Sequence, residues 1–337
     1  MNQPLRKSTI QDVAELSKVS SATVSYILNG RRNGKSRISP ATRQRVLDAA
    51  RQLDYSPNVA ARDLRRQRTD RVAFVTSSLS PFNTLFAHRV QEAADERGYF
   101  TMTLVAGTAN REHQIFNQLR RGLVDGAILV GTGFLEESHF RLLSEKGIAV
   151  VVMRNDIVPT EFDVIESNDE EACAEAADYL LAKGHRHIAV LGDMTDILIM
   201  KRIKLLLQVL HQRNIEVDHR YIRGDVPGRR VAYDVVQTLI KLDSPPTAIL
   251  AATDRAAIGA ILGARDAGLH VPQDLAVIGF GNIPEGEITR PSLTTIGPEM
   301  LNFSELAGLL FSRLESPEPL AGRMVMFPHQ LIIRGSA

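Results

Sequence analysis

Four small residues near the N-terminus, Ser20, Ser21, Ala22 and Thr23, have the types and spacing needed to contact DNA. The Ser20 hydroxyl can cap the start of a helix, so that the next three residues point outward from its first turn. Short hydroxyl and methyl groups in that position can reach base edges and phosphates in a major groove. This pattern predicts recognition of a double helix, not bond cleavage.

Two short helices joined by a turn are expected to position these residues. Thr9 and Asp12 have the spacing of a capping pair at the start of the first helix, and Val19 fills the turn. Ser39 and Pro40 predict the start of a third helix. The apolar faces of the three helices are Ile10, Val13, Ala14 and Leu16, then Val24, Ile27 and Leu28, then Val46, Ala49, Ala50 and Leu53. The pattern is that of a helix-turn-helix headpiece, although a generic small helical domain would share the caps and faces.

The charge of the chain is divided unevenly along its length. Residues 1–71 contain 15 Lys and Arg against 6 Asp and Glu, whereas residues 72–337 contain 25 against 33. The net charge of +1 therefore hides a strongly basic N-terminal segment. Such a segment releases counterions from a phosphate backbone, which favours double-stranded DNA as the partner over the generic helical domain.

The remainder of the chain alternates apolar strand patterns with helical patterns, which is typical of parallel α/β sheets. Roughly 265 residues exceed one comfortable core, so two doubly wound subdomains are expected, with a ligand cleft between them at the carboxyl ends of the strands. The expected strands are 72–76, 100–105, 127–130, 149–153, 188–191, 248–251 and 275–280. Helices are expected, for instance, over 85–97, 170–181, 201–213, 229–242 and 256–267.

Other chemistry is poorly supported by the residues. The segment 29–36 resembles a phosphate-binding loop but follows a helix and has Asn29 where the first glycine belongs. Gly131 and Gly133 follow a strand, yet Glu136 occupies the place of the third glycine of a dinucleotide site. No spacing suggests a catalytic group, a metal site or a cofactor, so we expect no enzyme. A solute-binding protein would share the α/β core but lack residues 8–64.

Dense, ordered motifs resemble the LacI/GalR family of bacterial transcription regulators. They include Thr-Ile-x-Asp-Val-Ala from Thr9, Val-Ser-x-x-Thr-Val-Ser-x-x-Leu-Asn-Gly from Val19, and Tyr-x-Pro-Asn from Tyr55. Later matches include Gly-His-Arg-His-Ile from Gly184 and Asp-x-x-Ala-Ile-Gly from Asp254, so nearly all 337 residues are covered. The headpiece is most similar to the fructose and sucrose regulators.

The resemblance implies three parts: a DNA-binding headpiece (1–56), a hinge helix and linker (57–71), and a core of periplasmic-binding-protein type (72–337). Its first subdomain takes about 72–167 and 299–324, and its second about 168–298 and 325–337. A repressor acting as a homodimer on operator DNA is expected. Lone Cys173, the lack of a membrane-length apolar stretch and the polar segment 1–7 favour the cytoplasm.

The residues that the resemblance assigns to DNA fall into three groups. Ser21, Ala22 and Tyr26 would read base edges, whereas Thr9, Ser20, Thr23 and Asn29 would hold phosphates. The hinge group is Asn58, Ala61, Arg62, Leu64 and Arg65, with Leu64 as an apolar wedge in the minor groove. Tyr26 departs from the frequent arginine, and Lys18 stands in the turn where the family usually has glycine.

The effector positions implied by the family are partly altered here. Phe82, Asn168, Arg202 and Asp254 are kept. Three usual carboxylates are absent, because Ser167, Gly281 and Arg154 occupy their places. Arg154 and Arg202 together favour an anionic effector, such as a sugar phosphate or sugar acid. The alternatives are a neutral sugar, no small effector, or an Arg154 that merely pairs with Asp156 or Glu166.

Overall fold

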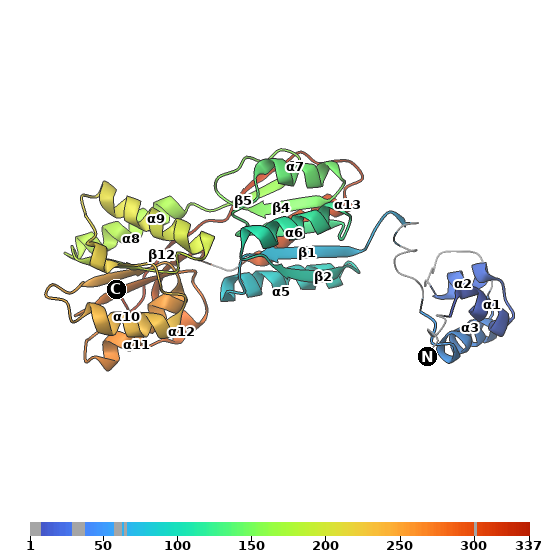
Figure 1. Cartoon of the computed structure of the whole chain (residues 1–337), viewed down its shortest axis with the longest axis horizontal. Helices are drawn as coiled ribbons and strands as arrows, with labels where there is room; N and C mark the ends of the chain where they lie inside the picture. Colours follow the sequence, from blue (N-terminus) through green and yellow to red (C-terminus); the bar gives the residue numbers. More distant parts are fainter. Residues whose placement is uncertain (1–7, 29–37, 57–62, 64–65, 300–301) are drawn as a thin grey trace, which may run out of the picture. The chain divides into compact units, whose positions relative to one another are not determined.

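The computed structural model describes residues 8–28, 38–56, 63, 66–299 and 302–337, and it divides into two compact units, Met1–Thr69 and Asp70–Ala337. The first unit is helical and the second contains two β-sheets with helices on both faces (Figure 1). The α/β class expected from the alternating patterns is therefore confirmed.

Three helices form the first unit: α1 (Ile10–Ser17), α2 (Ser21–Leu28) and α3 (Pro40–Gln52). Thr9 and Asp12 form the expected capping box, in which the Thr9 amide donates to Asp12 Oδ2 at 2.7 Å. Ser39 accepts the Thr42 amide at 3.1 Å, and Pro40 is the first residue of α3. The caps predicted from the sequence thus fix where these helices begin.

The turn between α1 and α2 closes without a glycine. Lys18 adopts a left-handed conformation (φ 53°, ψ 45°), and its amide reaches the carbonyl groups of Ala14 and Glu15 at the end of α1. The expectation that Leu16 joins the helical core was wrong, because its side chain is 44% exposed. Ser17 is buried instead and satisfies its hydroxyl by donating to the Val13 carbonyl at 2.6 Å.

The first sheet of the α/β unit is entirely parallel and has the order β11-β5-β4-β3-β1-β2. Its strands are β1 (Arg71–Thr76), β2 (Phe100–Val105), β3 (Gly126–Val130), β4 (Ala149–Met153), β5 (Asp163–Glu166) and β11 (Met324–Met326). One face packs against α5 (Pro81–Asp95) and α13 (Phe303–Glu315), and the other against α6 (Ala109–Arg120) and α7 (Glu137–Glu145).

The second sheet has the order β12-β10-β9-β8-β6-β7 and is parallel except for the pairing of β10 with β12. Its strands are β6 (Ile188–Leu191), β7 (Ile222–Arg223), β8 (Ala248–Ala251), β9 (Ala276–Phe280), β10 (Thr294–Gly297) and β12 (Gln330–Ile332). Helices α8 (Asp169–Ala182) and α9 (Ile197–Gln212) cover one face, and α10 (Arg229–Leu239) and α11 (Asp254–Asp266) cover the other. The short helices η1 (His219–Tyr221) and α12 (Glu285–Ile288) lie in the connections.

The chain passes between the two sheets three times: after β5, after β10, and between β11 and β12. All seven expected strands are present, with bounds within one residue of the predicted ranges. The expected helix starts at residues 85 and 201 were each four residues late. Ser80 caps α5 by accepting the Asn83 amide, and Asp196 caps α9 by accepting the amides of Leu198 and Ile199. The first turn of α9 thereby reaches the region between the sheets.

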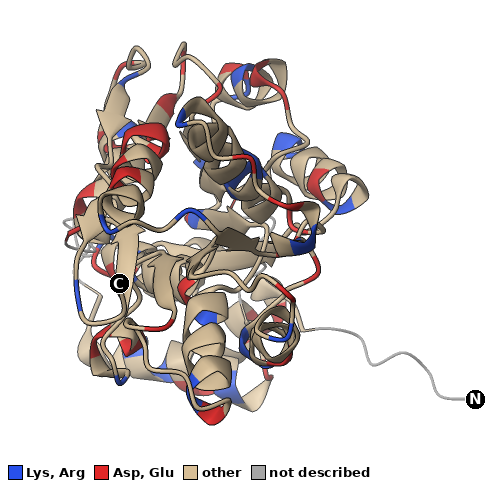
Figure 2. Cartoon of the chain, turned by 90° about the vertical axis from the view of Figure 1, so that its left-hand side faces the viewer, with Lys and Arg blue, Asp and Glu red and all other residues tan. Residues whose placement is uncertain are grey.

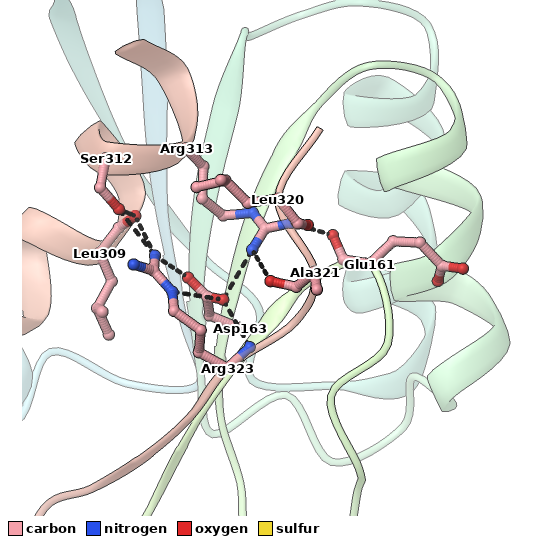
Figure 3. Close-up of polar contacts among 8 residues, drawn as sticks. All are labelled: Glu161, Asp163, Leu309, Ser312, Arg313, Leu320, Ala321 and Arg323. Atoms are coloured by element: carbon pink, nitrogen blue, oxygen red, sulfur yellow. Dashed lines mark hydrogen bonds and ion pairs between the residues drawn. The ribbon is translucent and has the colours of Figure 1, made fainter. Parts of the chain in front are cut away.

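A buried acid fastens the last part of the chain to the first sheet (Figure 3). Asp163 on β5 accepts Arg313 Nη1 of α13 at 2.7 Å and Arg323 Nη2 at 2.6 Å. Arg313 also donates to the Leu320 carbonyl at 2.6 Å and to the Glu161 carbonyl. These bonds hold α13, the segment before β11 and the start of β5 as one structure.

Candidate functional site

The start of α2 presents the small polar residues predicted from the sequence. Ser20 and Ala22 are exposed, and Ser21, Thr23 and Tyr26 are half-buried. The Ser20 hydroxyl accepts the Thr23 amide at 3.2 Å, which confirms the predicted cap and gives the helix its defined start. A capped helix with an exposed first turn is the geometry that places side chains against base edges.

Of the remaining residues predicted to contact DNA, the structure describes only Thr9. The Thr9 hydroxyl is bonded to Asp12 Oδ2 at 2.8 Å, within the capping box of α1. The candidates Asn29, Asn58, Ala61, Arg62, Leu64 and Arg65 lie outside the described residues.

A cavity of about 1010 Å³ lies between the two sheets of the α/β unit. Its walls include the residues that follow the strands, such as Gly131 after β3, Arg154 after β4 and Gly281 after β9. It is therefore at the carboxyl ends of parallel strands, as expected, and at the upper end of the usual size range for small-molecule sites. All six effector candidates from the sequence line it: Phe82, Arg154, Asn168, Arg202, Asp254 and Gly281.

Arg202, on the first half of α9, is a cation whose hydrogen bonding is incomplete. Its guanidinium carbon lies 3.9 Å from the centre of the Phe280 ring, and Nη1 donates to the Ala252 carbonyl at a long 3.4 Å. Within the described part of the chain, the buried Nε has no hydrogen-bond partner. Burial lowers the pKa of Arg202, an effect that nearby Asp169 and Asp254 oppose. Such a donor is arranged to receive an oxygen atom from a ligand.

Arg154 has a different role from the one expected for it. Its Nε and Nη2 bond both oxygens of Asp156 at 2.7 and 2.5 Å, and Nη1 donates to the Thr132 and Leu135 carbonyls. Hydrogen bonding by Arg154 lowers the pKa of Asp156 to about 2 against the effect of burial. Arg154 is therefore paired with Asp156, as the ion-pair alternative describes. It is not a second free cation beside Arg202 for an anionic ligand.

The loop that Arg154 contacts is also held by a buried acid. Glu112 of α6 accepts the amides of Gly133 and Phe134 at 3.0 and 2.9 Å. Burial raises the pKa of Glu112, although these amides favour its ionised form. Carboxylate and guanidinium together fix residues 132–135 at the edge of the cavity.

The two subdomains contact each other directly beside the cavity. Lys201 Nζ of α9 lies 3.2 Å from Asp156 Oδ2, which belongs to the segment after β4. Close packing accompanies this ion pair, because a Cβ atom on Gly133 would lie 2.6 Å from Ile197 Cγ1. The cavity is thus a cleft, and residues of α9 just before Arg202 connect its two walls.

Asp254, at the start of α11, is almost fully buried. It accepts the Thr295 hydroxyl and the Ile283 amide, the latter at 2.8 Å. Gly281 in the same loop has φ 132°, which favours glycine, and its amide donates to the Ile296 carbonyl at 2.7 Å. Asp254 therefore shapes the loop after β9 as well as lining the cavity.

Replacing Asp254 with asparagine is expected to change how stability depends on pH. Burial raises the pKa of Asp254 to about 6, so the folded chain holds this proton more tightly than the unfolded chain does. Its contribution to stability is complete below the unfolded pKa, near 4, and is lost as the pH rises through 6. The variant should therefore gain up to about 3 kcal/mol relative to the parent between pH 4 and pH 7.5. Urea unfolding at several pH values measures this, and parallel curves for the two proteins would contradict it.

Asn168 and Phe82 line the cavity through groups that also hold the fold. Asn168 Oδ1 accepts the His329 amide at 2.6 Å, and its Nδ2 donates to Glu171 at 3.1 Å. The Phe82 ring packs edge-on against Phe303, with centres 4.9 Å apart. Asn168 lies where the chain first passes from one sheet to the other, and Phe82 lies in the first turn of α5.

Sequence reasoning missed His329, which lies between β11 and β12 and lines the cavity. Its Nδ1 is 2.7 Å from Asp169 Oδ1, and its Nε2 is buried without a partner among the described residues. A single histidine in a short segment gives no periodic signal, so only its juxtaposition with Asp169 reveals it.

The capped three-helix unit, followed by two mainly parallel sheets around a ligand-sized cavity, defines a DNA-binding regulator with a small-molecule site. Residues 9–58 match the family described as bacterial regulatory proteins, lacI family, and residues 177–337 match the periplasmic binding protein-like domain. The chain is 30% identical over 339 residues to catabolite control protein A of Priestia megaterium, covering 97% of this chain and 98% of the relative. It is 31% identical to the HTH-type transcriptional regulator DegA of Bacillus subtilis, with 98% of each covered. The chain belongs to the LacI family of bacterial transcriptional regulators and is not an enzyme.

Solved structures agree with this fold. A LacI-family regulator from Silicibacter pomeroyi superimposes with a TM-score of 0.83 at 24% identity, covering 98% of this chain and 99% of that one. The lac repressor dimer bound to operator and an anti-inducer gives 0.73 at 22% identity, with coverage of 98% and 99%. The narrower similarity to fructose and sucrose regulators stays a prediction. Among the described residues, no helix is long and apolar enough to span a membrane, and no cluster of metal-binding side chains is found.

Proposed function

We propose that this regulator is a cytoplasmic repressor that binds operator DNA as a homodimer and responds to an anionic sugar derivative. The observation that carries the effector class is Arg202, a cavity-lining residue whose buried Nε has no hydrogen-bond partner among the described residues. A carboxylate or phosphate oxygen would complete its hydrogen bonding and its charge at once. Arg154 supports this role indirectly, by fixing the loop at residues 132–135.

A neutral sugar is the second candidate, and one observation favours it. Asp156 neutralises Arg154, and the cavity lining contains more acidic than basic residues, among them Asp169 and Asp196. The cavity therefore has no broad positive surface. Acidic and basic residues are likewise interspersed on the helices that face the viewer in Figure 2. A related regulator from Enterococcus faecium is described with bound ribose. The two candidates differ in whether the ligand must bring a negative charge to Arg202.

For the DNA side, we assign Ser21, Ala22 and Tyr26 to base edges and Thr9, Ser20, Thr23 and Asn29 to phosphates. The exposed, capped start of α2 supports this assignment. The hinge assignment of Asn58, Ala61, Arg62, Leu64 and Arg65 rests on the family motif. A helix in each of two major grooves and paired hinges in the minor groove would give a pseudo-palindromic operator.

Selection of binding sites from random duplex DNA, followed by titration with ligands, tests this function. The purified chain should enrich one pseudo-palindrome, and sugar acids or sugar phosphates should alter its affinity for that site. A response confined to neutral sugars would establish the second candidate. Salt-sensitive binding without enrichment of any sequence would contradict the repressor assignment.

Truncating Tyr26 to alanine is expected to weaken binding to the selected operator by about 1–3 kcal/mol while leaving binding to random DNA nearly unchanged. The reason is that a base-edge contact carries sequence information, whereas phosphate contacts do not. Fluorescence anisotropy with both duplexes measures the difference. Gln11→Ala, on the exposed surface of α1, serves as the control. An equal loss on both duplexes would place Tyr26 against the backbone.

A further inference from the structure

Three residues that line the cavity each carry a buried polar atom that lacks a hydrogen-bond partner within the described residues. The atoms are Arg202 Nε, Thr132 Oγ1 and His329 Nε2. Buried polar atoms are nearly always satisfied in folded proteins, so a group of three around one cavity indicates places where a bound molecule supplies the partner. Of the three, His329 has its geometry fixed most completely.

Three contacts hold the His329 ring in one orientation, and a fourth holds its backbone. Its amide donates to Asn168 and its Nδ1 bonds Asp169 at 2.7 Å, so the third passage between the sheets is tied to the first. The ring packs edge-on against Phe280 and Phe327, with centres 5.7 and 5.6 Å apart. The side chain is only 6% exposed. Its position is therefore set before any ligand arrives.

The partner on Nδ1 determines what Nε2 can do. Burial disfavours the charge of Asp169, but the hydrogen bond from His329 and the charges of His329 and Arg202 outweigh burial and lower its pKa. Asp169 is thus a carboxylate, which accepts a hydrogen from Nδ1. In the neutral ring this leaves Nε2 with its lone pair directed away from Asp169, as an acceptor.

We propose that His329 determines effector specificity by accepting a hydrogen bond from a ligand hydroxyl group through Nε2. This inference rests on the proposed function, because Arg202 would hold the anionic group of the same ligand. Both side chains pack against Phe280, Arg202 over its face and His329 at an angle to it. The cavity therefore selects a hydroxylated anion over a simple one.

The test compares gluconate with hexanoate, an anion of the same chain length that has no hydroxyl groups. Calorimetric titration of the full chain uses the parent, His329→Asn and His329→Gln. Asparagine retains a donor near Asp169 but has no atom at the Nε2 position, whereas glutamine places an amide oxygen or nitrogen there. Thermal unfolding confirms that each variant is folded.

We expect gluconate to bind the parent at least about 10-fold more tightly than hexanoate. His329→Asn should lose most of that preference and His329→Gln should recover part of it, while hexanoate affinity changes little. Unchanged preference in a folded His329→Asn chain would overturn the assignment of His329 alone. If neither gluconate nor a panel of other sugar acids and sugar phosphates binds the parent, the anionic-effector proposal fails and this inference fails with it. Enrichment of an operator in that case would show that the DNA-binding part of the function still stands.

Discussion

Replacing Asp163 with asparagine is expected to destabilise the α/β unit by about 3–5 kcal/mol, because the change leaves a buried cation without its counter-charge. Asp163 is fully buried and the Arg313 side chain is only 8% exposed. The Asp163 carboxylate compensates the desolvation of the Arg313 guanidinium, together with the backbone carbonyl groups of Glu161, Leu320 and Ala321. Asparagine would keep the shape of the site and remove the charge.

Urea unfolding followed by far-UV circular dichroism measures this loss. Asp234→Asn is the matched control, because Asp234 forms an exposed ion pair with Arg230 one helical turn away on α10. Exposed pairs of this kind contribute less than about 1 kcal/mol. A similar small effect for both variants would show that the carbonyl groups alone are sufficient to stabilise Arg313.

Replacing Arg202 with methionine should have opposite effects on binding and on stability. The flexible methionine side chain can still pack against Phe280. The substitution also removes the buried Arg202 Nε, which has no partner among the described residues, so the ligand-free chain should unfold at a higher temperature. Anionic effectors should lose at least about 30-fold in affinity, since a buried charged hydrogen bond is lost.

Thermal unfolding and calorimetric titration with sugar acids or sugar phosphates give the two measurements. Arg255→Met is the control, because Arg255 lines the same cavity but is exposed. Retained affinity for an anionic ligand in the Arg202 variant would contradict the assignment of Arg202. A lower unfolding temperature without any ligand would show that its contacts with Phe280 and Ala252 outweigh its burial.

Local patterns predicted the starts of the three N-terminal helices and seven of the strands well. Thr9, Ser20 and Ser39 bond their own helices, so their effect is visible within four residues of sequence. The central strands are continuous apolar runs because both faces of each sheet are covered. The class and the position of the cavity follow from those elements and their order.

The remaining features depend on contacts between distant segments. Strands β5, β7, β10, β11 and β12 were not predicted from the sequence, because they have two to four residues and carry little pattern of their own. Leu16 has helical spacing yet lies exposed, since burial also depends on what packs opposite. Arg154 was assigned to the ligand from its family position and its charge, with Asp156 or Glu166 as an alternative partner. The choice of Asp156 and the contacts with Thr132 and Leu135 became evident only in three dimensions.

The third passage between the sheets has a consequence for synthesis of the chain. Strands β11 and β12 are edge strands of different sheets, and β11 pairs with β5 while β12 pairs with β10. Each sheet therefore lacks one of its edge strands until residues 324–332 have left the ribosome. Neither half can finish folding during translation ahead of the other, and both exposed edges are covered within the same few seconds. A nascent chain stopped before residue 324 should consequently be a substrate for chaperones through both halves at once.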